Sequence, residues 1–321
     1  NYDSDGDGVM DSNDSHPTNA ALSQQIFGGA AISEWPTTAS IIFDVGYPTT
    51  NPNEMPESME WGDIDNDGDI DLFLSRRNGP NQVWLNDGSS GLNLMYWNHN
   101  RIDDTINSVL VDLNSDGWLD VISANTLSTN SMYFNNNGSF NQTVDWQSAL
   151  GGDSTSVSVG DIDGDNDLDI HFSSKYDYFL ENINGAISNN TLWTEPAITI
   201  PHGEGEFGQS QGFSQTYASV LGDLDRDGDI DLIQENYIVG NIDSEIYPHN
   251  IIWLNNGNNT FGQQNSAGQE EPDWISWHAH YGEDIELADL DGDGLLEIIT
   301  ASSFEPPTAA IVLVGDSIYQ N

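Results

Sequence analysis

A short acidic motif recurs five times in the chain, and its spacing suits the coordination of a hard metal ion. The copies begin at Asp63, Asp112, Asp161, Asp223 and Asp289. If that Asp is position 1, oxygen-bearing side chains fall at positions 1, 3, 5 and 9, and Gly usually occupies position 6. Ca²⁺ takes about six to eight oxygens from carboxylates, backbone carbonyls and water. The spacing therefore predicts five calcium loops.

Each position of the motif has an expected role in these loops. Positions 1, 3 and 5 face one centre, position 7 offers its carbonyl, and the acid at position 9 can bind through both oxygens. Mg²⁺ fits less well because it prefers few carboxylates and several waters. The predicted ligands are Asp63, Asp65, Asp67, Asp69 (carbonyl) and Asp71; Asp112, Asn114, Asp116, Trp118 (carbonyl) and Asp120; Asp161, Asp163, Asp165, Asp167 (carbonyl) and Asp169; Asp223, Asp225, Asp227, Asp229 (carbonyl) and Asp231; Asp289, Asp291, Asp293, Leu295 (carbonyl) and Glu297.

Short strands must hold these loops. A strand such as 156–159 precedes each loop, and a second strand such as 71–74 follows it. A third strand such as 82–85 leads to an Asn/Gly turn, and a less regular fourth strand reaches the next loop. Four antiparallel strands per repeat are typical of a propeller blade. We therefore expect an all-β fold, a β-propeller of five blades, although the pattern also permits six or seven.

The two ends of the chain bear on how such a ring closes. The fifth repeat supplies three strands, the last at 309–314, before the sequence ends at residue 321. An unassigned strand at 39–45 is expected to complete the last blade, and closure by a strand from a neighbouring molecule is the less favoured alternative. We divide the chain into a calcium-binding linker over residues 1–20 and a propeller over residues 21–321.

The loop pattern over residues 58–316 resembles the FG-GAP/VCBS repeat family, whose blades also build the propellers of integrin α-subunits. The resemblance implies that the loops share one face of the ring and hold structural Ca²⁺, about five ions in all. It also implies a secreted or cell-surface protein.

A sixth acidic loop lies at the start of the sequence. It repeats the 1, 3, 5, 9 spacing and is similar to a thrombospondin type 3 repeat, with Ser15 and His16 where that family has Cys. The resemblance implies one or more further Ca²⁺ ions in a stiffened linker, and the alternative is a disordered acidic tail. The predicted ligands are Asp3, Asp5, Asp7, Val9, Asp11 and Asp14.

The charge balance excludes several classes of partner. There are 53 Asp and Glu residues against 5 Lys and Arg, a formal net charge of −48. Nucleic acids and anionic membranes need basic side chains to neutralise phosphate. The chain has no Cys, so it has no disulfides, and no apolar run is long enough to span a membrane. Other extracellular proteins, surface glycans or copies of the chain itself remain as partners.

Long insertions are expected on the face opposite the calcium loops, where ligands commonly bind. In the richest of them Trp274, Trp277 and Tyr281 could stack on a sugar ring, with His278 and His280 donating hydrogen bonds. The alternative, which we favour, is that these aromatic residues pack between blades or form the fourth strand of a blade. Zinc binding by the same His residues with those at 202 and 249 is a weaker interpretation, because nothing fixes their spacing.

No set of residues singles out an enzyme active site. Carboxylate pairs are abundant, and only Glu204 and Glu206 outside the calcium loops merit a test as glycosidase residues. We expect a non-enzymatic extracellular calcium-binding module that acts in adhesion, surface display or fibre assembly. A lectin-like carbohydrate-binding module is the first alternative, and a glycan-active enzyme is the second.

Overall fold

The structure is a computed structural model that describes residues 54–88, 92–94, 102–151, 153–174, 177–196, 213–239, 250–257, 259–266, 268–276, 282–290, 292–302 and 311–313. All of these belong to one compact unit, residues 48–321. The linker predicted over residues 1–20 and the strand predicted at 39–45 lie outside the described residues.

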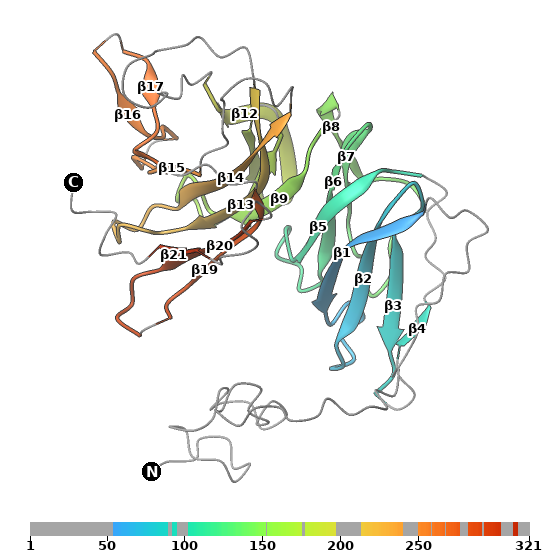
Figure 1. Ribbon diagram of the computed structural model, residues 1–321. Helices are drawn as coiled ribbons and strands as arrows, with labels where there is room; N and C mark the ends of the chain where they lie inside the picture. The colour runs from blue at the N-terminus through green and yellow to red at the C-terminus, as the bar shows by residue number, and fades with distance from the viewer. Residues whose placement is uncertain are drawn as a thin grey trace, which may run out of the picture. The chain divides into compact units, whose positions relative to one another are not determined.

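The described chain is all-β, which confirms the predicted class, and its strands form separate antiparallel sheets (Figure 1). The first two sheets contain β1 (Met55–Gly62), β2 (Asp71–Arg77), β3 (Gln82–Asn86) and β4 (Leu92–Leu94), then β5 (Thr105–Val111), β6 (Asp120–Asn125), β7 (Thr129–Tyr133) and β8 (Trp146–Gly151). The third contains β9 (Ser156–Gly160), β10 (Asp169–Ser173), β11 (Tyr178–Ile183) and β12 (Ala186–Thr194). In each of the three, the strands pair in chain order.

The later sheets repeat this plan with differences. The fourth contains β13 (Phe213–Gly222), β14 (Asp231–Val239), β15 (Ile251–Trp253) and β18 (Trp274–Ile275), and the fifth contains β19 (Gly282–Ala288), β20 (Glu297–Ser302) and β21 (Ile311–Leu313). The hairpin of β16 (Gln263–Gln264) and β17 (Glu270–Glu271) is inserted between β15 and β18. Within its described residues, the structure contains no helix with the length and hydropathy of a membrane span.

Every acidic loop begins and ends at the same positions relative to the two strands that it connects. The first strand of each sheet ends one residue before position 1 of the motif, and the second strand begins at position 9. The closing pairs are equivalent, as in Gly62 with Asp71 and Gly160 with Asp169. The second strands are buried on both faces, for example along the whole of β6 and β10. The acid at position 9 is therefore the first residue of a buried strand, which fixes its position.

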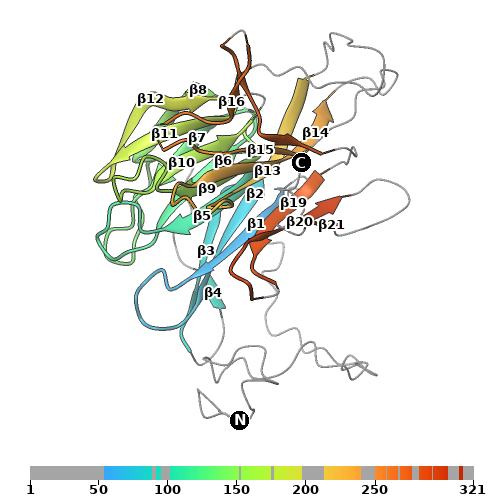
Figure 2. The same cartoon turned by 90° about the vertical axis from the view of Figure 1, so that its left-hand side faces the viewer.

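Neighbouring sheets pack through apolar clusters. The first strands contact one another in succession, β1 with β5, β5 with β9, β9 with β13 and β13 with β19. Figures 1 and 2 both show β13 beside β19. One cluster joins the third and fourth sheets through Phe179, Trp193, Trp253 and Phe261, whose rings contact one another. Burial of such large side chains stabilises each junction by several kcal/mol, roughly 1.5–3 kcal/mol per side chain.

Candidate metal centres

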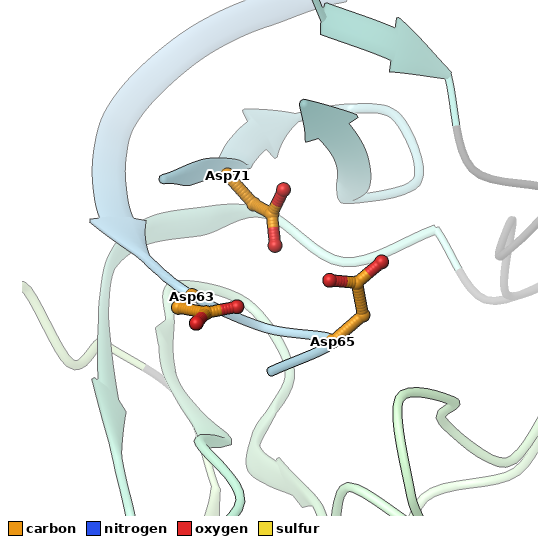
Figure 3. Close-up of side chains that lie close together, drawn as sticks. All are labelled: Asp63, Asp65 and Asp71. Carbon is orange, nitrogen blue, oxygen red and sulfur yellow. The ribbon is translucent and has the colours of Figure 1, made fainter. Parts of the chain in front are cut away.

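Three of the acidic loops bring three carboxylates together. In each, ligand oxygens of positions 1, 3 and 9 lie within 4.8 Å of one another, and the acid at position 9 is buried. Figure 3 shows the carboxylates of Asp63, Asp65 and Asp71 turned toward one common space. The other two groups are Asp161, Asp163 and Asp169, and Asp223, Asp225 and Asp231.

The acid at position 9 is fixed by two backbone hydrogen bonds. In the second sheet, Asp120 Oδ2 accepts from the N–H of Leu113 (3.2 Å), and its Oδ1 accepts from the N–H of Asn135 (2.8 Å). The same pair of contacts recurs at Asp71, Asp169 and Asp231. A carboxylate held through both oxygens keeps its orientation whether or not an ion is bound.

The acid at position 1 shapes the turn of the loop. Asp63 accepts hydrogen bonds from the N–H groups of Asp67 (3.1 Å) and Gly68 (2.9 Å), and Asp112 does the same for positions 5 and 6 of its loop. Gly68 has a φ of 96°, in the region that favours glycine. Asn166, which replaces Gly in the third loop, has a φ of 74°.

The acid at position 5, also a predicted ligand, lies outside these three-residue groups and makes a contact of its own. The grouped oxygens belong to positions 1, 3 and 9 only. The position-5 carboxylate instead accepts a hydrogen bond from the N–H of position 7, as Asp67 does from Asp69 (2.9 Å) and Asp165 from Asp167 (2.8 Å). This contact uses one oxygen of the carboxylate and leaves the other for a ligand, so its predicted role stays a prediction.

The side chain at position 7, for which only a carbonyl role was predicted, supports a neighbouring turn. Asp167 Oδ2 accepts a hydrogen bond of 2.8 Å from the N–H of Asn184, in the turn between β11 and β12. The equivalent Asp69 lies so close to Gly88 that a Cβ there would stand 2.4 Å from its Oδ2. The loop and the later hairpin of one sheet thus brace each other.

Burial and mutual repulsion make these acids hard to ionise. Burial, opposed by the two backbone hydrogen bonds, raises the pKa of Asp120 and of Asp169 to about 6 and that of Asp231 to about 7. Burial and the neighbouring carboxylates also raise the pKa of Asp65. A cation would remove the repulsion and favour the charged forms.

Two orphaned oxygens show that the loops fit a metal ion. Asp65 Oδ1 and Asp223 Oδ1 are buried and have no hydrogen-bond partner among the described residues. A buried carboxylate oxygen without a donor is costly, and a cation satisfies it. Three carboxylates, backbone carbonyls and water are the donor set that Ca²⁺ prefers. The geometry is compatible with one ion in each of the three loops.

The remaining two loops differ in their donors. In the second, position 3 is Asn114, whose amide oxygen accepts from the N–H of Asp116 (3.0 Å). This loop therefore has one carboxylate fewer at positions 1, 3 and 9, while its position-1 acid makes the same backbone hydrogen bonds as in the first loop. In the fifth, Glu297 takes position 9 and its Oε2 accepts from the N–H of Leu290 (2.7 Å). Asp291 lies outside the described residues.

An Asn at or just beyond the end of the third strand links each of the first three loops to the next sheet, and the sequence interpretation missed this role. Asn135 Nδ2 donates to the carbonyl of Ile64, at position 2 of the first loop (2.8 Å). Asn182 does the same to Leu113 (3.0 Å), and Asn255 to Ile162 (2.9 Å). The signal in the sequence is an Asn that recurs one or two residues before the predicted Asn/Gly turn.

Direct contacts between loops add to this link. Asn66 Nδ2, at position 4, donates to the carbonyl of Gly117 in the next loop (2.9 Å). Arg226, also at position 4, donates to the carbonyls of Asp293 and Gly294, both at 3.0 Å. Both pairs connect loops of successive sheets.

The residues predicted to bind sugars are only partly described. Trp274 forms part of β18 and packs against the apolar cluster of the fourth and fifth sheets, which supports the packing interpretation. Residues 277–281, and with them the rest of the predicted sugar-binding group, lie outside the described residues, as do Glu204, Glu206 and the N-terminal loop.

A buried polar group at the third and fourth sheets was not expected from the sequence. His171 Nδ1 lies 3.0 Å from Ser219 Oγ, and its Nε2 lies 3.4 Å from Asp177 Oδ2. Asp177 also accepts from Gln234 Nε2 (2.7 Å). His171 and Asp177 are fully buried and Ser219 nearly so. Because these residues are buried, a substrate could not reach them, and they suit a polar contact between sheets rather than a catalytic nucleophile.

Comparison with known proteins identifies one segment. Residues 112–172 match a protein family described as FG-GAP-like repeat. This segment runs from the second acidic loop through the third loop into β10. It therefore contains an FG-GAP-type repeat. No curated protein matches the chain.

Proposed function

We propose that the chain is a non-enzymatic, extracellular module whose Ca²⁺ ions stabilise a β-propeller of five blades. The observation that carries this proposal is the recurrence of one carboxylate arrangement. It occurs at the same register position in the first, third and fourth sheets. A catalytic centre is needed once, whereas a structural ion is useful in every repeat. The extensive hydrogen bonding of the carboxylates to backbone N–H groups also suits a structural role.

The contacts between sheets support the propeller. Their first strands follow one another from β1 to β19, as the inner strands of successive blades would. Burial, and after it repulsion from Glu286 on β19, raise the pKa of Glu60 on β1, which supports the proposed proximity of the first and fifth sheets.

An exposed apolar face on the first sheet supports a role in assembly. Met59 and Trp61 on β1 are 59% and 53% exposed, whereas the residues equivalent to Met59 in the other sheets are buried: Ser108, Val157, Ser219 and Ile285. Those equivalents are covered by a preceding sheet. The face of β1 can thus receive a sheet of the same kind, and as the alternative to closure of the ring by the fifth sheet we propose that a second copy of the chain supplies it.

Calcium removal tests the structural proposal. Thermal unfolding followed by circular dichroism is expected to show a large fall in Tm on chelation by EDTA, restored by Ca²⁺ and not by Mg²⁺ at equal concentration. Each bound ion stabilises the folded state by an amount that rises with its concentration, about 2.7 kcal/mol at 100 times Kd. An unfolding curve indifferent to EDTA and to added Ca²⁺ would overturn the proposal.

A further inference from the structure

A buried pair, Glu235 and Asn250, lies in the fourth sheet away from the acidic loops, and Asp284 of the fifth sheet is close enough to act on Glu235 electrostatically. Glu235 lies within β14, Asn250 immediately precedes β15, and Asp284 lies near the start of β19. β14 packs directly against β19. Each acidic loop connects the first strand of a sheet to the second strand. Glu235 and Asp284 lie within strands, several residues away from these loops, so they are not part of them.

Oxygen atoms of this group lack donors. Glu235 has no exposed surface, and its Oε2 accepts a hydrogen bond of 2.7 Å from Asn250 Nδ2. The other oxygen, Oε1, is buried and has no hydrogen-bond partner among the described residues. The same holds for Asn250 Oδ1, on a side chain that is itself almost fully buried. A buried carboxylate and a buried amide thus each present an unsatisfied acceptor.

No basic side chain among the described residues compensates this group. Burial, and after it the negative charge of Asp284, raise the pKa of Glu235 to about 8. The basic side chains that the structure describes are engaged elsewhere: Arg76 and Arg77 pair with Glu54 and Glu57, and Arg226 binds loop carbonyls. A buried carboxylate without a cationic partner is strongly unfavourable.

Comparison with the other sheets shows that Glu235 is an exception. The second strands of the first three sheets carry Ser75, Ala124 and Ser173 at this register position, four residues after position 9. The fold therefore does not require an acid here. A proton on Glu235 Oε1 that donates to Asn250 Oδ1 is the alternative to an ion, and the calcium counts below distinguish the two.

We propose that Glu235, Asn250 and Asp284 form a further cation site, separate from the acidic loops, for a hard divalent ion such as Ca²⁺. Two carboxylates and an amide oxygen are oxygen donors of the kind that Ca²⁺ takes, with water completing its shell. Asp284 is exposed to solvent, whereas Glu235 and Asn250 are buried. An ion in this position ties the fourth sheet to the fifth.

Counting bound calcium tests the site in the whole chain. Calcium content after equilibrium dialysis is expected to fall by one ion per chain in Glu235→Gln, which keeps the shape of the side chain and removes its charge. Asp284→Asn changes an exposed residue, so it is expected to leave the chain folded and to lose the same ion. Glu60→Gln, which neutralises a partly buried acid on β1, serves as the matched control and is expected to retain every ion.

A loop variant separates this inference from the proposed function. Asp225→Ala removes an oxygen donor from the loop of the fourth sheet and is expected to weaken a different ion. If Glu235→Gln and Asp284→Asn retain the full calcium content while Asp225→Ala loses an ion, the further site is disproved and the structural loops stand. If Asp225→Ala retains its calcium, the proposed function fails instead. If Glu235→Gln does not fold, the count for Asp284→Asn decides.

Discussion

At the scale of single residues, the acid at position 9 has two functions that can be separated. It is a predicted ligand, and it also satisfies two backbone N–H groups at the junction of the loop with the third strand. For Asp120 these are the N–H groups of Leu113 and Asn135. The second function does not depend on an ion, because the hydrogen bonds form within the protein.

Replacement of this acid is therefore expected to destabilise the chain even without calcium. Asp120→Ala leaves two buried N–H groups unpaired and should lower the free energy of unfolding by about 2–4 kcal/mol in EDTA. Denaturation in urea measures it. Asp145→Ala is the matched control, since Asp145 also accepts a backbone N–H, from Phe134, but is exposed; it should cost about 1 kcal/mol or less. If Asp120→Ala and Asp145→Ala lowered the free energy of unfolding equally, the buried N–H groups that Asp120 satisfies would not contribute to stability as proposed.

A second residue-scale prediction concerns Glu60. Burial and repulsion from Glu286 raise the pKa of Glu60 in the folded chain from 4.5 to about 7. The folded state thus favours the protonated form, so stability is lost as the pH rises from about 4.5 through about 7. Because Gln carries no charge, Glu60→Gln should match the wild type near pH 4 and exceed it at pH 8.

The expected gain at pH 8 is about 1–2 kcal/mol, reduced from the full value of the pKa shift because solvent screens this partly exposed side chain. Chemical denaturation of both proteins across this pH range measures it. A difference between them that did not vary with pH would show that Glu60 acts through packing and not through its charge.

At the scale of the elements, the loops and hairpins of adjacent sheets fit closely enough to exclude a methyl group. Gly185, in the turn between β11 and β12, has a φ of 83°, and a Cβ there would stand 2.6 Å from the Cβ of Asn114 in the preceding loop. Gly117, in the second loop itself, has a similar φ of 88° and open space around it. The two glycines separate backbone strain from contact between sheets.

Gly117→Ala should cost only the strain of a left-handed residue, about 1–2 kcal/mol. Gly185→Ala should cost this and a further 1–3 kcal/mol or so, because the added methyl group must displace the neighbouring loop. Urea denaturation of both variants in the presence of Ca²⁺ measures the difference. Similar values would mean that the loops of adjacent sheets are not held against each other in solution.

The sequence predicted the elements better than it predicted their connections. Asp residues at alternate positions must face one centre, and alternating apolar runs must pair, so loops and strands such as 156–159 were evident. The link from Asn135 to Ile64 was not evident, because it joins residues 71 positions apart. The pairing of β15 with β18 across the β16–β17 hairpin was equally hidden, since β18 has two residues and carries no strand pattern of its own.

At the scale of the whole molecule, the exposed face of the first sheet predicts concentration-dependent association. Trp61→Ser should reduce or abolish self-association in the presence of Ca²⁺, because it removes the largest apolar side chain of that face. Light scattering over a range of protein concentrations measures it. Ile183→Ser is the matched control, since Ile183 is also about half exposed but belongs to the third sheet.

The light-scattering result decides what covers the exposed face of β1. Association that depends on Trp61 and not on Ile183 supports contact between copies. A wild-type chain that stays monomeric at every concentration would remove that proposal, and a lower Tm for Trp61→Ser would then assign the face to an intramolecular contact.

The link formed by the third-strand Asn has a consequence for how such a chain can change in evolution. The first three repeats each present a carbonyl at position 2 of the loop, and the second, third and fourth repeats each supply an Asn that donates to the carbonyl of the repeat before it. Because the second and third repeats carry both halves of the connection, duplication or deletion of either of them leaves the neighbours matched. The stretches between loops, which differ in length from repeat to repeat, can diverge without breaking the joint. The architecture is thus modular at the level of the gene as well as the protein.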